Sequence, residues 1–236
     1  MQVSQIYISD GGERLSPYLT QCVDRVKALY SNMKHVLYGK EALREFLVTK
    51  FDSEVVGAFD KLNPYAYKSD LGRYCLLYEF GGWYFDISVL PLTSVTLQSS
   101  VETLAFRDIQ MYSGTCWACS IGVLFAQPKR PVFETAIRKV VENCRTQYYG
   151  ITALCPTGPS LLGQAFALHG SNPNCIFGDL QVLTPLHATR NMAFVLPDGM
   201  MLALRKPSEG GDLVSLGATG TNNYNDFYNS RTVYRS

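Results

Sequence analysis

The sequence predicts an α/β fold in which helices cover both faces of a mixed sheet. Short runs rich in β-branched and aromatic residues alternate with stretches whose apolar residues recur every three or four positions, as strands and amphipathic helices do. The chain has 236 residues, which is enough to bury one sizeable core. Apolar residues make up 47% and charged residues 17% of the sequence, the composition of an ordinary globular protein. No linker or internal repeat divides the chain, so we expect a single domain over residues 1–236.

The N-terminal part is expected to begin with a strand at 3–9, which ends at a turn of Asp10 and two glycines. An amphipathic helix is predicted at 17–30. Ser16 is placed to cap it, Pro17 suits its first turn, and apolar residues recur at helical spacing. The next expected elements are a strand at 35–38 and helices at 41–51 and 53–62.

Residues 68–92 form the stretch around which the rest of the chain is organised. A helix with one apolar side is expected to end at Gly81-Gly82, because glycine adopts the left-handed conformation of a helix end at little steric cost. The run 83–89 is aromatic and β-branched and is predicted to be a buried strand. Asp86 interrupts that run, and a carboxylate in such a place is costly unless a cation or hydrogen-bond donors meet it.

Asp70 and Arg73 lie three residues apart in the same predicted helix and therefore share a face. The spacing permits a mutual ion pair, which would be a structural role. It equally permits both side chains to reach a ligand at the end of the strand that carries Asp86.

The remaining chain is predicted to add strands and two helices, with pairing beside the Asp86 strand stopping at 90–92. Thr157 and Gly158 open the last helix. Thr157 or Ser160 would cap it, and a helix N-terminus with a small-residue loop also welcomes an anionic or polyhydroxylated ligand. The expected strands are 101–109, 120–126, 181–184, 193–196 and 200–204, and the expected helices are 132–144 and 160–168.

Charge and hydropathy argue against several classes of partner. The net charge is +1 and no long basic run is present, so nucleic acid is a poor partner and an anionic membrane would attract the chain little. No apolar run is long enough to cross a membrane, and the N-terminus lacks the basic and apolar parts of a signal peptide. We therefore expect a cytoplasmic protein without a transmembrane segment, and leave peripheral membrane association open.

The chain has seven cysteines, an odd number scattered through apolar runs, which favours reduced and buried thiols. Cys116 and Cys119 form a C-x-x-C, the spacing of half a zinc site or of a redox pair. No second such pair complements it. A metal- or thiol-dependent interaction protein is therefore a rival hypothesis, and the less favoured one.

Two strings carry a resemblance to a known family: KSDLGRY at 68–74 and LYEFGGWYFDISV at 77–89. Together they resemble the DXD-containing sugar transferases of glycosyltransferase family 32, distant relatives of the catalytic domains of the large clostridial glucosylating toxins. Thr-Gly-Pro at 157–159 matches a second marker of this family. One departure matters: Ser88 stands where the family has the second aspartate of its Asp-x-Asp motif.

The resemblance implies a GT-A-like fold and a function. The expected reaction moves a hexose from a UDP- or GDP-linked sugar to a saccharide acceptor, in surface or capsular polysaccharide synthesis and with retention of configuration. It implies Mn²⁺ or Mg²⁺ as the cofactor that neutralises the leaving diphosphate. The departure at Ser88 raises an alternative, a catalytically weak or inactive nucleotide-sugar-binding protein.

Carried over by position, Asp86 would contact ribose and sugar hydroxyls and reach the metal, and Ser88 would occupy the direct metal-ligand position. A serine hydroxyl is a neutral and weaker ligand, so metal affinity should fall. Asp70 and Arg73 would gather sugar hydroxyls. The other expected donor contacts are Tyr7, Tyr84, Thr157 and Gly158.

In the relatives a C-terminal loop closes the site and supplies further metal ligands. Here the expected ligands in that place are Asn222, Asn225 and Asp226. The segment 217–234 is rich in glycine and asparagine, which is typical of a flexible terminus, yet its aromatic residues need a surface to pack on. We therefore expect this tail to order over the donor, and its removal to spare the fold.

Overall fold

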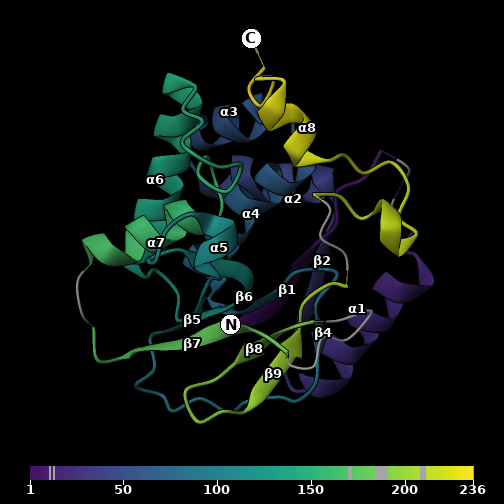
Figure 1. The fold of residues 1–236 in the computed structure, drawn as a ribbon, viewed down its shortest axis with the longest axis vertical. Coiled ribbons are helices and arrows are strands. Elements are labelled where there is room, and N and C mark those ends of the chain that lie inside the picture. Colours follow the sequence, from purple (N-terminus) through teal and green to yellow (C-terminus); the bar gives the residue numbers. More distant parts are fainter. Residues whose placement is uncertain (11, 13, 170–171, 184–190, 208–210, 236) are drawn as a thin grey trace.

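The computed structural model describes residues 1–10, 12, 14–169, 172–183, 191–207 and 211–235 (Figure 1). The strands are β1 (Gln2–Ile6), β2 (His35–Tyr38), β3 (Gly82–Phe85), β4 (Leu90–Pro91), β5 (Thr103–Arg107), β6 (Cys119–Ala126), β7 (Cys175–Val182), β8 (Met192–Val195) and β9 (Met201–Leu204). The helices are α1 (Pro17–Leu29), α2 (Lys40–Lys50), α3 (Ser53–Lys61), α4 (Tyr65–Phe80), α5 (Gln110–Ser113), α6 (Pro131–Thr146), α7 (Pro159–Leu168), α8 (Tyr224–Asn229) and the short 3₁₀ helix η1 (Val214–Leu216).

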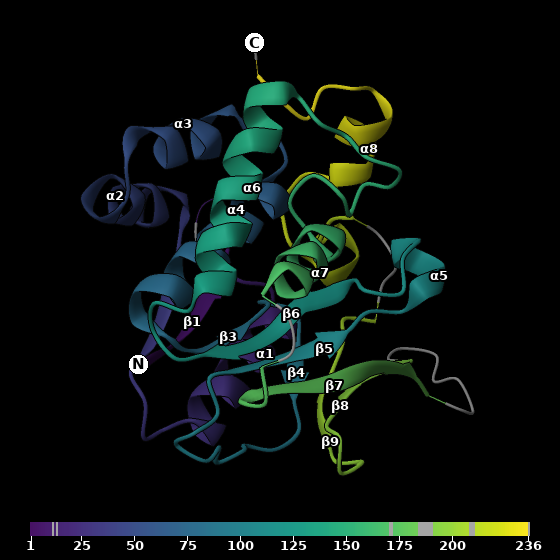
Figure 2. The same ribbon diagram turned by 90° about the vertical axis from the view of Figure 1, so that its left-hand side faces the viewer.

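Across the described ranges the strands form one sheet in the order β2-β1-β3-β6-β5-β7-β8-β9-β4. The pairs β1–β2, β1–β3 and β5–β7 are parallel, whereas β3–β6, β5–β6, β7–β8, β8–β9 and β4–β9 are antiparallel. Helices α3, α4, α6 and α7 gather over one face, and α1 lies against the other (Figures 1 and 2). The predicted mixed sheet with helices on both faces is therefore confirmed.

The helix α4 is buried on nearly all sides. It packs on β1, β3 and β6 and is covered by α2, α3 and α6. Even its charged residues are enclosed: Lys68, Asp70 and Arg73 are each buried, and the Lys68 ammonium donates to the carbonyl of Phe59. Burying a charged group is tolerated only when it is paired or hydrogen-bonded. The polar residues of α4 are thus committed to specific contacts. None of the helices in the described ranges is long and apolar enough to cross a membrane.

The glycine pair ends α4 as expected and also brings two strands together. Gly81 has φ of +61° and closes the helix with a hydrogen bond from its amide to the Leu77 carbonyl, 3.0 Å long. Gly82 has φ of +90°, and a Cβ built there would lie 2.1 Å from the carbonyl oxygen of Gln2. Only glycine fits so close to β1. The pair therefore sets the direction in which β3 leaves the helix.

The strand predicted at 83–89 is shorter than expected, because β3 ends at Phe85. The amide of Asp86 still bonds to the Gly122 carbonyl at 2.8 Å, but the amide of Val89 turns back to the Asp86 carbonyl at 3.0 Å. The chain therefore leaves the sheet directly after the carboxylate. The expectation that pairing stops at 90–92 is wrong: β4 pairs antiparallel with β9 at the far edge of the sheet.

Strand β7 begins earlier than the strand predicted at 181–184, whose last residue, Thr184, lies outside the described residues. Gly178 interrupts the apolar pattern of β7, so the sequence did not indicate the first part of this strand. In the structure a Cβ on Gly178 would lie 2.3 Å from the Val195 carbonyl oxygen, so glycine is required where β7 approaches β8. The other predicted strands and helices lie within a few residues of their observed positions. Helices α5, η1 and α8 were not predicted.

The C-terminal tail belongs to the core on the α4 side of the sheet (Figures 1 and 2). The ring of Tyr224 stacks on that of Tyr67 with 5.8 Å between centroids. Val233 is fully buried, and Tyr234 forms a β-bridge with Leu62. The expectation that removing 217–236 would spare the fold is therefore wrong, since the removal would expose core surface.

Candidate functional site

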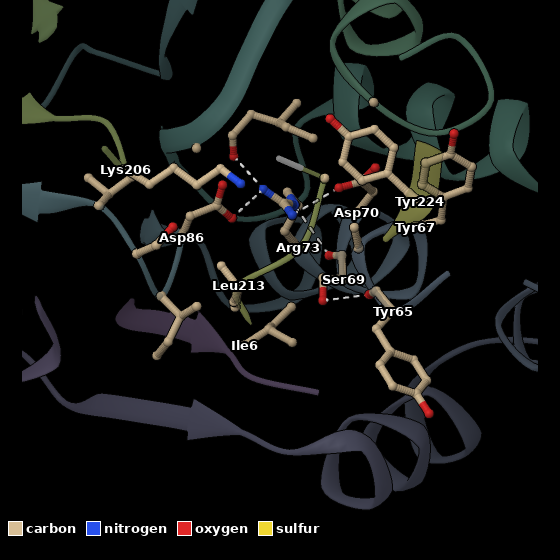
Figure 3. Close-up of a pocket in the computed structure, with 18 of the residues that line it drawn as sticks. Ile6, Tyr65, Tyr67, Ser69, Asp70, Arg73, Asp86, Lys206, Leu213 and Tyr224 are labelled. Atoms are coloured by element: carbon tan, nitrogen blue, oxygen red, sulfur yellow. Dashed lines mark hydrogen bonds and ion pairs between the residues drawn. The ribbon is translucent and has the colours of Figure 1, made fainter. Parts of the chain in front are cut away.

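A pocket opens at the ends of β1 and β3, between α4 and the C-terminal residues 211–224 (Figure 3). Because β1 and β3 are parallel, their carboxyl ends meet at one edge of the sheet, which is the usual place of a ligand site in α/β folds. The charged residues that line the pocket are Asp70, Asp86, Asp108, Asp212, Arg73, Arg205 and Lys206.

Arg73 is the hub of the pocket floor. Its Nη2 lies 2.9 Å from Oδ1 of Asp70, and its Nη1 lies 2.7 Å from Oδ1 of Asp86. The same Nη1 donates to the carbonyl of Ile121 at 2.7 Å, and Nε donates to the carbonyl of Ser69 at 3.3 Å. The ion pair permitted by the i,i+3 spacing is therefore formed. It extends across the pocket floor to Asp86, which comes from another element.

Asp86 is held firmly on one side and open on the other. Its Oδ1 accepts the bond from Arg73 and a second one, 3.0 Å long, from the hydroxyl of Tyr84. Its side chain is 35% exposed, in contrast to the 4% of Arg73. A Cβ on Gly122 would lie 3.2 Å from Oδ2, so the absence of a side chain there leaves room beside this oxygen. The carboxylate is thus positioned by the protein and available to a ligand.

Asp70 is enclosed by its partners. Thr157 donates from Oγ1 to Oδ2 of Asp70 at 2.6 Å, and Arg73 holds the other oxygen. Burial raises the pKa of Asp70 to about 6, against the lowering effects of Arg73 and Thr157. This carboxyl group therefore titrates close to the neutral range, unlike an exposed aspartate.

The predicted cap of the helix at 160–168 is corrected by the structure. Gly158 occupies the N-cap position of α7 and makes no side-chain cap bond. Thr157 instead supports Asp70 from behind and is not among the residues that line the pocket. Ser160 donates to the carbonyl of Ser113 at 3.5 Å. Gly158 itself lines the pocket.

The two predicted donor-contacting tyrosines both reach the pocket. Tyr84 is fully buried, and its ring lies beneath the guanidinium of Arg73, whose Cζ is 4.6 Å from the ring centroid. Tyr7 is 4% exposed and packs with Ile87 and Leu216. Among the described residues the Tyr7 hydroxyl has no hydrogen-bond partner, although it is buried. A buried hydroxyl without a protein partner is expected to form a hydrogen bond with a ligand or with water.

Sequence reasoning missed Arg205 and Lys206, which follow β9 directly, and the carboxylates of Asp108 and Asp212. Lys206 donates from Nζ to the carbonyl of Asp212 at 3.1 Å. Burial, together with the nearby charge of Arg205, lowers the pKa of Lys206 to about 8. A signal was present in the sequence, since two adjacent cations stand at the end of the strand predicted at 200–204.

The C-x-x-C pair does not converge on the pocket. Cys116 is exposed and Cys119 is buried, and both are free thiols. Burial raises the pKa of Cys119 to about 12, so its thiolate is scarce at neutral pH. Within the described part of the chain no group of three or more His, Cys, Asp or Glu side chains is arranged to hold a metal ion. The geometry therefore gives the thiol hypothesis no support.

Comparison with known proteins finds a family that matches the part of the chain carrying this arrangement. Residues 16–105 match the family described as a glycosyltransferase sugar-binding region containing a DXD motif. This range contains the Asp70–Arg73 pair, Asp86 and Ser88. Over this range the chain is similar to the DXD-containing glycosyltransferases.

Two curated proteins match part of this chain. Over 134 residues it is 28% identical to an uncharacterized glycosyltransferase of Acanthamoeba polyphaga mimivirus, covering 56% of this chain and 51% of the relative. Over 166 residues it is 22% identical to inositol phosphoceramide mannosyltransferase 2 of Schizosaccharomyces pombe, covering 69% of this chain and 45% of the relative. The chain thus spans about half the length of the curated relatives it matches.

A solved structure confirms the fold of this chain. The PaToxG glycosyltransferase is similar over 72% of this chain and 68% of its own, with a TM-score of 0.53 and 16% sequence identity. The mixed sheet and its flanking helices are therefore of the GT-A-like kind that the sequence predicted.

DXD glycosyltransferases generally use a divalent metal ion, so the fit of such an ion is tested at Asp86-Ile87-Ser88. Asp86 supplies one carboxylate, of which Oδ1 already accepts two hydrogen bonds. Ser88 adds a neutral hydroxyl, and the cation Lys206 lines the same pocket. Mg²⁺ and Mn²⁺ prefer several oxygen ligands, with carboxylates among them. These residues do not fit a metal ion held tightly by the protein alone.

The three ligands expected from the tail are placed differently from one another. Asn222 lines the pocket, but its Oδ1 accepts from the amide of Tyr65 at 2.9 Å and so fixes the start of α4. Asn225 and Asp226 lie in α8 and are not among the lining residues, and Asp226 is exposed. The tail contributes Thr221 and Tyr224 to the pocket instead.

Proposed function

We propose that this glycosyltransferase transfers a hexose from a UDP- or GDP-linked sugar to a saccharide acceptor, with residues 1–236 acting as one domain. The observation that carries the proposal is the Asp86 carboxylate. It stands at the DXD position, is oriented by Arg73 and Tyr84, and leaves one oxygen uncovered in a pocket at the sheet edge. A carboxylate presented in this way accepts hydrogen bonds from sugar or ribose hydroxyls.

The three motif side chains would divide the work. Asp86 would contact the donor directly. Arg73 is enclosed by its protein partners, so it would act as a positioning residue that holds Asp86 and Asp70 at the pocket floor. Asp70 lines the pocket and would meet sugar hydroxyls in its ionised form. The same three residues would thereby determine where the anomeric carbon lies.

The nucleoside would bind at the end of β1. Tyr7 and Thr221 each have a buried hydroxyl that lacks a hydrogen-bond partner in the described ranges, and both line the pocket. A ribose or base would supply the missing partners. The aromatic ring of Tyr7 would also pack on the ligand.

In the proposed reaction the bond between the anomeric carbon and the diphosphate oxygen breaks, and its electron pair stays on that oxygen. The acceptor hydroxyl oxygen bonds to the anomeric carbon from the same face, which retains configuration, and its proton passes to the leaving diphosphate. If Mn²⁺ or Mg²⁺ takes part, it would enter with the donor, whose diphosphate supplies oxygens that the protein lacks. The acceptor would be a growing surface or capsular polysaccharide.

A binding and hydrolysis screen tests this function. UDP- and GDP-hexoses, including glucose, galactose and mannose, would be added to the protein in thermal-shift measurements with and without Mn²⁺. We expect at least one of them to raise Tm and to be hydrolysed slowly when no acceptor is present. Asp86→Ala should abolish the hydrolysis.

The second candidate, an inactive nucleotide-sugar-binding protein, is favoured by Ser88 and has its own signature. It would show a rise in Tm without any donor hydrolysis or transfer under either metal condition. The absence of any rise in Tm with every nucleotide sugar would contradict both candidates.

A further inference from the structure

The position of Lys206 is dictated by the far edge of the sheet. Strand β4 pairs antiparallel with β9, with Leu90 opposite Leu204 and Pro91 opposite Ala203. Ser88 precedes β4 by two residues and Lys206 follows β9 by two residues, and both line the pocket. The cation therefore shares the pocket with the one residue that departs from the DXD motif.

The side chain of Lys206 is turned into the pocket. Figure 3 shows it running beside Asp86 toward the pocket floor, and both residues line the cavity. Its ammonium feels the attraction of Asp86 and Asp212 and the repulsion of Arg205. Its Nζ also donates to the carbonyl of Asp212 at 3.1 Å. A partly buried ammonium that faces a polyanion site is an effective counter-charge, because the low local dielectric strengthens the attraction.

The proposed reaction requires a positive charge at this point of the pocket. The departing diphosphate gains negative charge, and a cation must neutralise it. The residues at Asp86-Ile87-Ser88 do not fit a tightly held metal ion. Because Ser88 replaces the second aspartate of the motif, the pocket lacks a negative charge that would compete with the diphosphate for the Lys206 ammonium.

We propose that Lys206 takes the place of the metal ion: its ammonium, in the pocket that Ser88 also lines, binds the donor diphosphate and neutralises the leaving group, so that transfer proceeds without a divalent cation. This inference rests on the proposed function. The anomeric carbon–oxygen bond breaks toward the diphosphate, the acceptor oxygen bonds to the anomeric carbon, and the acceptor proton passes to the diphosphate. Lys206 remains protonated throughout. Arg73 and Arg205 are the other cations among the described residues that line the pocket.

Calorimetric titration in EDTA tests the binding half of the proposal. The probes are UDP and GDP, each compared with uridine or guanosine, which lack the diphosphate. The wild type should bind one diphosphate at least about 10-fold more tightly than its nucleoside. Lys206→Gln should weaken the diphosphate about 10- to 100-fold and leave the nucleoside affinity unchanged, which also shows that the variant is folded.

Three further variants sharpen the test. Lys206→Arg keeps the charge and should recover most of the diphosphate affinity. Lys27→Gln changes an exposed lysine on α1 and should match the wild type. The double variant Ser88→Asp with Lys206→Gln should bind the diphosphate weakly in EDTA. It should regain diphosphate affinity when Mn²⁺ replaces the EDTA, because a carboxylate then stands where the serine was.

Turnover in EDTA tests the catalytic half. The wild type should keep most of its donor hydrolysis or transfer in EDTA, and Lys206→Gln should lose about 100-fold in kcat under the same conditions. The proposal is overturned if the wild type binds nucleoside diphosphates only with Mn²⁺, or if Lys206→Gln binds them as tightly as the wild type. Neither outcome harms the proposed function, which fails only if no nucleoside diphosphate or nucleotide sugar binds the wild type with or without metal.

Discussion

Arg73→Lys is the substitution that separates a structural ion pair from a functional one. The guanidinium makes four contacts, to Asp70, Asp86, Ile121 and Ser69, in a buried place. A lysine ammonium is a compact point charge that cannot span two carboxylates as the planar fork does. Loss of about two charge-assisted contacts, at roughly 1.5 kcal/mol or more each, predicts a loss of about 3 kcal/mol in the free energy of unfolding. For a chain of this length, that corresponds to a fall in Tm of roughly 6–12 °C.

The same substitution should impair catalysis, because Asp86 loses the donor that orients it. A displacement of about 1 Å at a reacting centre costs on the order of 100-fold in rate, so we expect kcat/KM for the donor to fall by about that factor. Thermal unfolding followed by circular dichroism and steady-state donor hydrolysis would be measured on the same samples, below the Tm of the variant.

Arg138→Lys is the matched control. Arg138 forms an ion pair with Asp52 at 2.8 Å, but its side chain is 51% exposed, and exposed pairs contribute about 0–1 kcal/mol. It should therefore leave both measurements nearly unchanged. A fall in Tm at Arg73→Lys no larger than in this control would refute the buried network. A large fall in Tm with unaltered kcat/KM would show that the pair is structural only.

Three further predictions follow from the site and the tail. Asp86→Ala should abolish donor turnover with a loss of only about 1–3 kcal/mol in the free energy of unfolding, because Arg73 keeps its other partners; near-normal turnover would contradict the site assignment. The Asp70 pKa of about 6 predicts that kcat/KM falls as the pH drops through 6, where protonation removes its charge from the Arg73 pair. This folded-state pKa lies above the ordinary value, so protonation of Asp70 between about pH 6 and 4 favours the folded state. Through this group, the free energy of unfolding should therefore not decrease over the pH range in which kcat/KM falls. Asp70→Asn should lack this fall of kcat/KM at acid pH. Deleting 217–236 removes the fully buried Val233 and its aromatic neighbours, so urea unfolding should show a loss of at least about 4 kcal/mol, and an unchanged urea midpoint would refute the core role of the tail.

The sequence predicted most of the elements because their signals are local. The helix before Gly81, the glycine stop and the strand after it follow from backbone preferences that act over a few residues. The i,i+3 spacing of Asp70 and Arg73 similarly permitted their ion pair, although the resemblance to the family pointed to a ligand role. That resemblance also came mainly from one continuous stretch.

Other features had no local signal. The end of β3 at Phe85 and the return of Leu90 to a distant edge of the sheet depend on the β4–β9 pairing, which no local pattern encodes. The aromatic residues of 224–234 indicated a need for a surface but not which surface. The assignment of Thr157 as a helix cap was wrong because Asp70, far away in the sequence, offers its hydroxyl a charged acceptor.

The sequence by itself therefore determined the fold class, the helix–glycine–strand unit and the carboxylate at its end. Only the tertiary structure decided what surrounds that carboxylate: the guanidinium of Arg73 on one side, the space above Gly122 on the other, and Lys206 in the same pocket. The physical reason is range. Backbone conformation is chosen by neighbours along the chain, whereas the electrostatics of a site are the sum of charges that strand pairing and packing bring together.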